Sequence, residues 1–267
     1  MPDNAPILWH LSISHYSEKA RWALDYKSVE HERRASMPGP HMARAFRLTR
    51  GRQVTLPVLE LDGKRIGDST AIIEALERRF PEPPLYPDDP EERRRALELE
   101  DWFDEELGPY MRRLLFNEGR RDRERFDQVV ARMMPGALAR FERLNGASAR
   151  MFTALRYGAG SSRAAERARG RVLAALDRLE AELGQDDYLV GGRFTVADLT
   201  AASLLYPLVL PPEGPFLVDR PAEGYERFRA PLKERRGYRW IQEMFRRHRQ
   251  PEAARAAART PAASRAS

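Results

Sequence analysis

The sequence predicts an α/β domain over residues 1–81, followed by an all-helical domain over residues 92–250. Strand-like and helical patterns alternate in the first part, and no strand of comparable quality follows it. Between the two parts lies the segment PEPPLYPDDPEE, whose density of proline and acidic residues is typical of a linker. We therefore place the linker at residues 82–91. The last residues, 251–267, lack apolar anchors, so we expect a mobile tail.

The first element is the stretch ILWHLSISHYSEKARWAL, which starts at Ile7 and reads as a strand, a serine-rich turn and a helix. Apolar and aromatic residues alternate at its start, as in a buried strand. From Ser17 the apolar residues fall at helical spacing, and either Ser14 or Ser17 can cap the helix. Partial positive charge at such a helix N-terminus favours a thiolate, a carboxylate or a phosphate.

Two weaker elements follow, a strand over residues 29–33 and a short helix over residues 41–49. The stretch VTLPVLELDGKRIGDS then reads as a β-hairpin, because Asp62-Gly63 is a strong two-residue turn signal between strand formers. Pro57 interrupts the first strand of this hairpin. It therefore requires a sheet edge or a special backbone geometry, a cis bond among them.

A third helix ends the α/β domain. Asp68 and Ser69 stand immediately before its apolar residues, so either could be the N-cap. In chain order the domain is β-α-β-α-β-β-α, and we expect a mixed sheet.

The second domain is predicted as a series of helices over residues 93–116, 122–145, 165–183, 195–208 and 237–249. The first of these is broken or bent near Gly108-Pro109, since proline removes a helix hydrogen bond. The helix over residues 195–208 is the most apolar and should be the buried centre of the domain. Thr195 and Asp198 occupy the two positions of a capping box, so we interpret them as folding elements without a catalytic role.

Composition excludes several classes of protein. Hydrophobic residues make up 42% and charged residues 32% of the chain, which is ordinary for a globular protein. No apolar run approaches the roughly 20 residues that cross a bilayer, and the N-terminus does not resemble a signal peptide, so we expect a cytoplasmic protein without a membrane partner. Cysteine is absent, which removes disulfides, thiolate metal sites and protein-thiol chemistry. We predict no metal site.

The chain is basic, with a formal net charge of +6 and an isoelectric point near 9.8. Arginine dominates the basic residues, and much of it stands beside Asp or Glu, as in PEERRRALELEDWFDEE. Such interleaving is typical of solvated helix faces and not of a phosphate-binding stripe. We therefore do not expect nucleic acid as a partner.

Four short motifs in this order resemble the cytosolic glutathione transferase family. SHYSEKARWAL is similar to the turn in which a serine, tyrosine or cysteine precedes the first helix, and TLPVLELDG to the hairpin with a cis-proline. GDSTAIIEAL is similar to the acidic-serine motif before the third helix, and FTVADL to the capping box of a buried sixth helix. The resemblance implies a thioredoxin-like N-terminal domain, an all-α helical bundle after it, and a serine-type active site.

The resemblance also implies how glutathione would bind as co-substrate. Ser14 occupies the position of the hydroxyl that donates to the glutathione sulfur. Pro57 matches the cis-proline, so the backbone of Leu56 would pair with the cysteinyl part. Asp68 and Ser69 match the pair that holds the γ-glutamyl end. For the glycyl carboxylate, the segment GPHMARAFRLTRGRQV offers His41, Arg52 and Gln53 without a clear match.

Some alternatives remain open from the sequence. Tyr16 could supply the hydroxyl in place of Ser14, whereas Ser17 is better interpreted as a cap. We interpret His10 as structural and His15 as an exposed loop residue. The leading hypothesis is a detoxifying transferase that conjugates glutathione to an electrophile. The alternatives are a non-catalytic binding or assembly module of the same fold, and an enzyme that uses another low-molecular-weight thiol.

The second substrate would be a hydrophobic electrophilic small molecule. Aromatic and apolar residues of the helical domain could line its pocket: Trp102, Phe103, Tyr110, Met111 and Phe116. The resemblance further implies a homodimer. In this chain, the acidic and aromatic helix around Asp101 and Trp102 would face the partner subunit.

Overall fold

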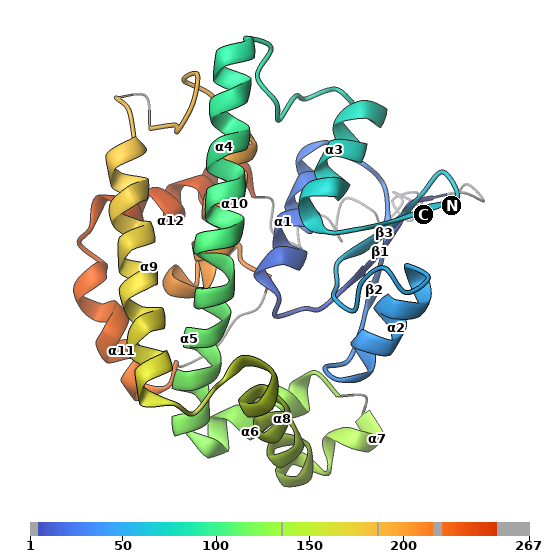
Figure 1. The fold of residues 1–267 in the computed structure, drawn as a ribbon, viewed down its shortest axis with the longest axis vertical. Coiled ribbons are helices and arrows are strands. Elements are labelled where there is room, and N and C mark those ends of the chain that lie inside the picture. Colours follow the sequence, from blue (N-terminus) through green and yellow to red (C-terminus); the bar gives the residue numbers. More distant parts are fainter. Residues whose placement is uncertain (1–4, 135, 186, 216–220, 250–267) are drawn as a thin grey trace, which may run out of the picture.

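The computed structural model describes residues 5–134, 136–185, 187–215 and 221–249, and the predicted tail lies outside them. An α/β domain stands beside a larger helical domain (Figure 1). The first domain has the predicted order of elements: β1 (Ile7–His10), α1 (His15–Tyr26), β2 (Glu32–Ala35), α2 (Pro40–Leu48), β3 (Val58–Leu61), β4 (Lys64–Gly67) and α3 (Ser69–Arg79). No helix or strand occupies residues 80–89. The domain boundaries proposed above stay predictions.

The four strands form a mixed sheet in the order β2-β1-β3-β4. β1 runs parallel to β2 and antiparallel to β3, and β3 pairs with β4 in the antiparallel sense. Asp62 and Gly63 join β3 to β4 with φ angles of 48° and 74°, as in a two-residue turn that matches the strand twist. This thioredoxin-like domain, followed by a helical domain, is the predicted fold class.

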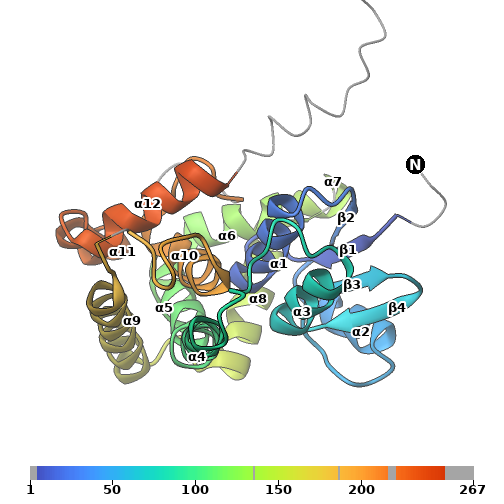
Figure 2. The same cartoon turned by 90° about the horizontal axis from the view of Figure 1, so that it is seen from above.

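Successive residues of the strands face two separate cores, because side chains alternate across a sheet. Leu8 and Leu59, partners across β1 and β3, lie in the main core with residues of α1 and α3. Val58 lies in a small core with Ala45 and Leu48 of α2. α2 thus covers one face of the sheet, and α1 and α3 cover the other, towards the helical domain (Figure 2).

The helical domain comprises α4 (Pro90–Glu106), α5 (Gly108–Arg121), α6 (Arg123–Arg132), α7 (Gly136–Ala139), α8 (Glu142–Tyr157), α9 (Ser162–Glu182), α10 (Val196–Val209), α11 (Glu223–Arg229), a 3₁₀ turn (Ala230–Leu232) and α12 (Arg236–His248). The predicted break near Gly108 is confirmed. The single helix predicted over residues 122–145 is wrong, because the chain divides it into three helices. The sequence there contains Pro135-Gly136, both unfavourable in a helix interior. α11 is absent from the prediction.

Helix α10 is the buried centre of the domain, as predicted, and every one of its residues is buried. Its N-terminus is held by Asp198. The backbone N–H and the hydroxyl of Thr195 donate to Asp198 Oδ2, both at 2.8 Å, and the N–H of Leu189 donates to Oδ1 at 2.9 Å. In the described part of the chain, no helix is both long and apolar enough to cross a membrane.

We expect Thr195→Ala to lower the free energy of unfolding by about 0.5–2 kcal/mol, because the cap of α10 is lost. Urea unfolding followed by circular dichroism measures this change. Thr195 is 1% exposed and its hydroxyl is bound to Asp198, so activity per folded molecule should stay near that of the wild type. Loss of activity with stability intact would instead give Thr195 a role in the site.

A buried ion-pair cluster joins the two domains. The Lys19 ammonium on α1 lies 2.8 Å from Glu100 Oε1 and 2.6 Å from Asp104 Oδ2, both on α4. It also donates to Thr70 Oγ1 of α3 at 2.9 Å. The side chains of Lys19 and Glu100 are 0% exposed, so no water replaces these contacts. Three helices from both domains are thus held by one cation.

The end of α12 is also tied to α1. Arg249 donates to Glu18 Oε1 and Asp25 Oδ2, each at 2.6 Å, and all three side chains are almost fully buried. The indole N–H of Trp22 donates to the carbonyl of His248 at 2.9 Å. The C-terminal end of α12 therefore supplies hydrogen-bond and ion-pair partners to side chains of α1.

Candidate active site

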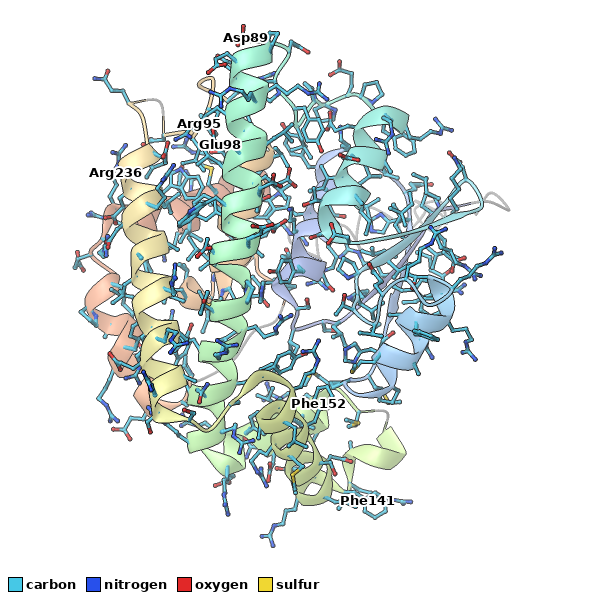
Figure 3. All side chains as sticks on the ribbon, viewed as in Figure 1. Asp89, Arg95, Glu98, Phe141, Phe152 and Arg236 are labelled. Carbon is cyan, nitrogen blue, oxygen red and sulfur yellow. The ribbon has the colours of Figure 1, made fainter. Side chains whose placement is uncertain are left out.

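A cavity of about 740 Å³ lies between the two domains. The α/β domain contributes the turn after β1, the start of α2 and the residues before β3. The helical domain contributes α5, α6, α8 and part of α10. Phe152 of α8 lines the cavity and lies on the side of that helix towards the rest of the molecule, whereas Phe141 lies on the outer side (Figure 3). The lining is mostly apolar, as expected for a site that takes small organic molecules.

Ser14 forms part of the cavity wall as the N-cap of α1. Its Oγ accepts a hydrogen bond from the N–H of Ser17 at 3.2 Å, which uses an acceptor lone pair only. Among the described residues, none accepts a hydrogen bond from the Ser14 O–H. The serine can therefore cap the helix and donate into the cavity at the same time.

The hydroxyl of Tyr16, the other candidate donor, bonds to α4 and not to the cavity. Tyr16 is not among the residues that line the cavity, and its O–H donates to the backbone carbonyl of Asp104 at 2.7 Å. Burial, together with the nearby Asp104 charge, raises the pKa of Tyr16 well above its usual value. Its hydroxyl thus joins α1 to α4.

The two neighbours of Tyr16 in the turn are structural. Ser17 is buried, and its Oγ accepts from the N–H of Leu11 at 3.2 Å, so it braces the turn. The prediction that His15 is an exposed loop residue is wrong, because it is 3% exposed. Burial, assisted by the charge of Arg112, lowers the pKa of His15 to about 3. The neutral ring donates from Nε2 to the carbonyl of Gly108 at 3.0 Å.

The Leu56–Pro57 peptide bond is cis, as predicted. Leu56 precedes Pro57 just before β3, and it lines the same cavity as Ser14. Pro57 itself does not line the cavity.

Asp68 and Ser69 stand at the start of α3, outside the cavity lining. Asp68 is exposed and is the N-cap, and its Oδ1 accepts from the N–H groups of Thr70 and Ala71 at 2.9 Å and 3.3 Å. Ser69 is 2% exposed. The amides of Thr70 and Ala71 at the start of α3 thus already have the Asp68 side chain as their acceptor.

The three candidates for the glycyl carboxylate differ in position, and Arg52 is exposed outside the cavity lining. His41 lines the cavity at the start of α2, is 6% exposed and accepts at Nδ1 from the N–H of Gly39 at 3.1 Å. Burial lowers its pKa, so it is neutral at pH 7. Gln53 lies outside the cavity lining, and its amide donates to the carbonyl of Thr55 at 3.0 Å. The structure therefore brings Ser14, His41 and Leu56 together around the cavity, and Gln53 braces the loop before β3.

The predicted apolar pocket is only partly correct. Phe116 lines the cavity, but Phe103 and Met111 are fully buried in the main core. Trp102 packs beneath the guanidinium of Arg178 on α9, 5.6 Å from its ring centre. Helix α8, whose boundaries the sequence prediction misplaced, supplies Phe152 and Tyr157 instead.

Arg112 is a charged cavity residue that the sequence analysis did not predict. Its guanidinium lies over two aromatic rings, 4.8 Å from the centre of Tyr157 and 5.9 Å from that of Tyr16. Nothing in the sequence distinguishes it from the many other arginines of the helical domain. Only the tertiary contacts place it beside the Ser14 turn.

Comparisons with known proteins agree with this architecture. The family model for the glutathione S-transferase N-terminal domain matches residues 8–84, and the model for the C-terminal domain matches residues 162–230. A maleylacetoacetate isomerase of Dictyostelium discoideum is 30% identical over 116 residues, which are 41% of this chain and 51% of the relative. The chain thus spans about half the length of that relative.

Two solved structures share the whole fold. The β-etherase LigF from Sphingobium sp. strain SYK-6 has a TM-score of 0.59 at 21% identity, with 90% of this chain and 99% of that chain covered. A theta class glutathione S-transferase from Xanthomonas axonopodis pv. citri, solved with glutathione bound, has a TM-score of 0.56 at 22% identity, with 88% and 96% covered. The two family models span more than half of the chain between them, the first over the α/β domain and the second over part of the helical domain, so the protein belongs to the glutathione S-transferase family.

Proposed function

We propose that the protein binds glutathione and transfers it to an electrophilic small molecule. The observation that carries this proposal is the Ser14 hydroxyl, which caps α1 at the wall of a cavity between the domains and donates its O–H to none of the described residues. For this reaction the site must stabilise the thiolate form of glutathione. A thiol with a pKa near 8.5 is only a few per cent ionised at pH 7, and lowering the pKa by two units needs roughly 2.7 kcal/mol.

Two features of the turn can supply this energy together. A hydrogen bond from Ser14 O–H to the sulfur is charge-assisted, and the N-terminus of α1 adds partial positive charge. The thiol proton leaves to solvent, and the sulfur then forms a bond to the electrophilic carbon while the leaving group departs with its electron pair. Because the chain has no cysteine, no step passes through a protein thiol.

The remaining glutathione contacts are proposed from the same arrangement. The Leu56 backbone would pair with the cysteinyl part beside Pro57. Asp68 and Ser69 would meet the γ-glutamyl end. His41 and Gln53 are the candidates near the glycyl end, where neutral His41 would donate a hydrogen bond instead of a charge.

Binding and thiolate formation can be tested separately. Retention on a glutathione affinity resin, with elution by free glutathione, tests binding. The pH titration of thiolate ultraviolet absorbance in the complex tests the chemistry, and we expect its midpoint to lie one to two pH units below that of free glutathione. Retention with an unshifted midpoint would favour a binding module over an enzyme. No retention would favour another thiol or a non-catalytic assembly role.

We also propose a homodimer. Asp101 is exposed on α4, next to Trp102, and could meet a partner subunit there. Light scattering at micromolar concentration should give twice the mass of one chain, and Asp101→Arg should shift the equilibrium towards the monomer. A wild-type monomer at that concentration would contradict the proposal. The cytoplasmic location and the role in detoxification stay predictions.

A further inference from the structure

The cavity contains a cation to which the described residues offer no anionic partner. Arg112 lies half-buried on α5, and no carboxylate or carbonyl of the described residues accepts a hydrogen bond from its guanidinium. Its Nε is fully buried and has no acceptor among them. In this part of the chain the guanidinium lies over the rings of Tyr16 and Tyr157. A buried donor without an acceptor costs free energy, which an arriving anion would recover.

Three other charged groups line the cavity, and each differs from Arg112 in having a partner: Glu118, Arg125 and Arg132. Glu118 is 1% exposed and is paired with both Arg121 and Arg169. Arg125 is paired with Asp122 at 3.2 Å and donates to the carbonyl of Pro221 at 2.6 Å. The negative charge of the lining is therefore already neutralised, and Arg112 keeps its donors for a molecule in the cavity.

Aromatic rings surround the same position. Phe116 and Tyr157 stack with their centres 5.2 Å apart, and Phe152 meets Tyr157 edge-on at 6.1 Å. All three residues line the cavity. A ligand that filled this part would present a flat apolar body to these rings and an acceptor group to the guanidinium.

From these contacts we infer that the second substrate is an aromatic acid, whose carboxylate or sulfonate binds Arg112 while its ring lies against Phe116, Phe152 and Tyr157. This inference rests on the proposed transferase function and adds the substrate class. Arg112 comes from the helical domain, opposite Leu56 and His41 of the α/β domain, so it faces the side of the cavity left for the second substrate. Because it also lies close to His15, the acid group would be held near the Ser14 turn.

Binding can be measured without any transfer reaction. The probes are 2-naphthoate and the neutral 2-naphthylmethanol, which share one ring system, titrated calorimetrically into the full chain with and without S-methylglutathione. We expect the wild type to bind the acid more tightly than the alcohol. Arg112→Met should weaken binding of the acid roughly 10- to 150-fold, the range for a hydrogen bond to a charged group, and leave the alcohol nearly unchanged. Arg112→Lys should recover part of the loss.

Two controls decide what a loss of binding means. Arg125→Met removes a cavity arginine that already has partners, so it should leave the preference for the acid intact. An equal loss in both variants would indicate a diffuse positive potential and overturn the assignment to Arg112. Melting curves identify any variant that fails to fold, in which case Arg112→Lys alone carries the comparison.

The thiolate of glutathione is the other anion that Arg112 could meet. If Arg112→Met raised the pKa of bound glutathione and left naphthoate binding unchanged, Arg112 would serve the thiol and the substrate inference would be wrong. Equal wild-type affinity for acid and alcohol would also overturn it. Naphthoate binding can be measured without glutathione, so the two proposals can fail separately. If only the transferase proposal fails, naphthoate still binds in a way that depends on Arg112, but the pKa of the glutathione thiol is not lowered.

Discussion

Lys19→Met is expected to lower the free energy of unfolding by about 3–5 kcal/mol, the cost of breaking a buried ion pair from one side. Glu100 is 0% exposed and would remain in the interior without its cation. Asp104, which is 17% exposed, would lose the same partner. Because the cluster joins α1 and α3 to α4, the loss should loosen the contact between the domains. Chemical unfolding of the two proteins measures the difference.

The loss of stability in Lys19→Met should also depend on pH. Burial raises the pKa of Glu100 in the wild type, and Lys19 opposes this rise, so removing Lys19 would raise the pKa further. The folded variant would then bind a proton that the unfolded chain, with its ordinary pKa, releases. Stability from this group is therefore present at low pH and is lost as pH rises, so the defect of Lys19→Met should be smaller at pH 5 than at pH 8.

A second substitution provides the matched control. Lys19→Met combined with Glu100→Gln removes the uncompensated charge, so the double variant should be more stable than Lys19→Met alone. By contrast, Arg94→Ala removes pairs with Glu91 and Glu98 on the exposed face of α4, where solvent screens them, and should change stability little. A loss for Lys19→Met as small as that for Arg94→Ala would contradict a structural role for the cluster.

Ser14→Ala is expected to reduce the transfer rate per folded molecule roughly 10- to 150-fold at neutral pH, as one hydrogen bond to the thiolate is lost. The bound thiol should titrate about one to two pH units higher. Binding of glutathione should persist, because the alanine only removes the hydroxyl. The variant also loses the cap on the Ser17 N–H, so folded protein must be quantified in parallel.

Tyr16→Phe and Ser17→Ala are the controls for Ser14. Both hydroxyls already have backbone partners, the carbonyl of Asp104 and the N–H of Leu11. Each change should lower stability and leave the thiol titration unchanged. If the lowered pKa of the bound thiol is lost only in Tyr16→Phe, the proposed reaction still holds, but Tyr16 and not Ser14 supplies the hydroxyl.

Local sequence signals predicted the α/β domain well. Asp62-Gly63 specifies a two-residue turn by its backbone preference alone, and the capping pair of α10 lies within four residues of chain. Such signals depend on neighbours in sequence, so they can be read without the fold. The division of residues 122–145 was also signalled, by Pro135-Gly136, but the apolar pattern around it favoured one helix.

The environment of the cavity could not be predicted in the same way. Arg112 and Arg113 are adjacent on one helix, yet Arg113 donates to the carbonyl of Tyr157, whereas Arg112 lies over the ring of the same tyrosine. His15 is buried and bonds to the carbonyl of Gly108 in the other domain, with Arg112 close by. These differences arise from contacts between segments 44 to 93 residues apart, which no local pattern reports.

The contact between Arg249 and α1 has a consequence for the order of events during synthesis. Helix α1 leaves the ribosome well before its partner, because the second cation that pairs with Glu18 is encoded 231 residues later. Until then, Glu18 has Arg21 of its own helix as a partner, while Trp22 lacks the carbonyl of His248. The nascent α/β domain would thus expose a tryptophan and an incompletely paired carboxylate, and it would reach its final packing only after Arg249 has been translated.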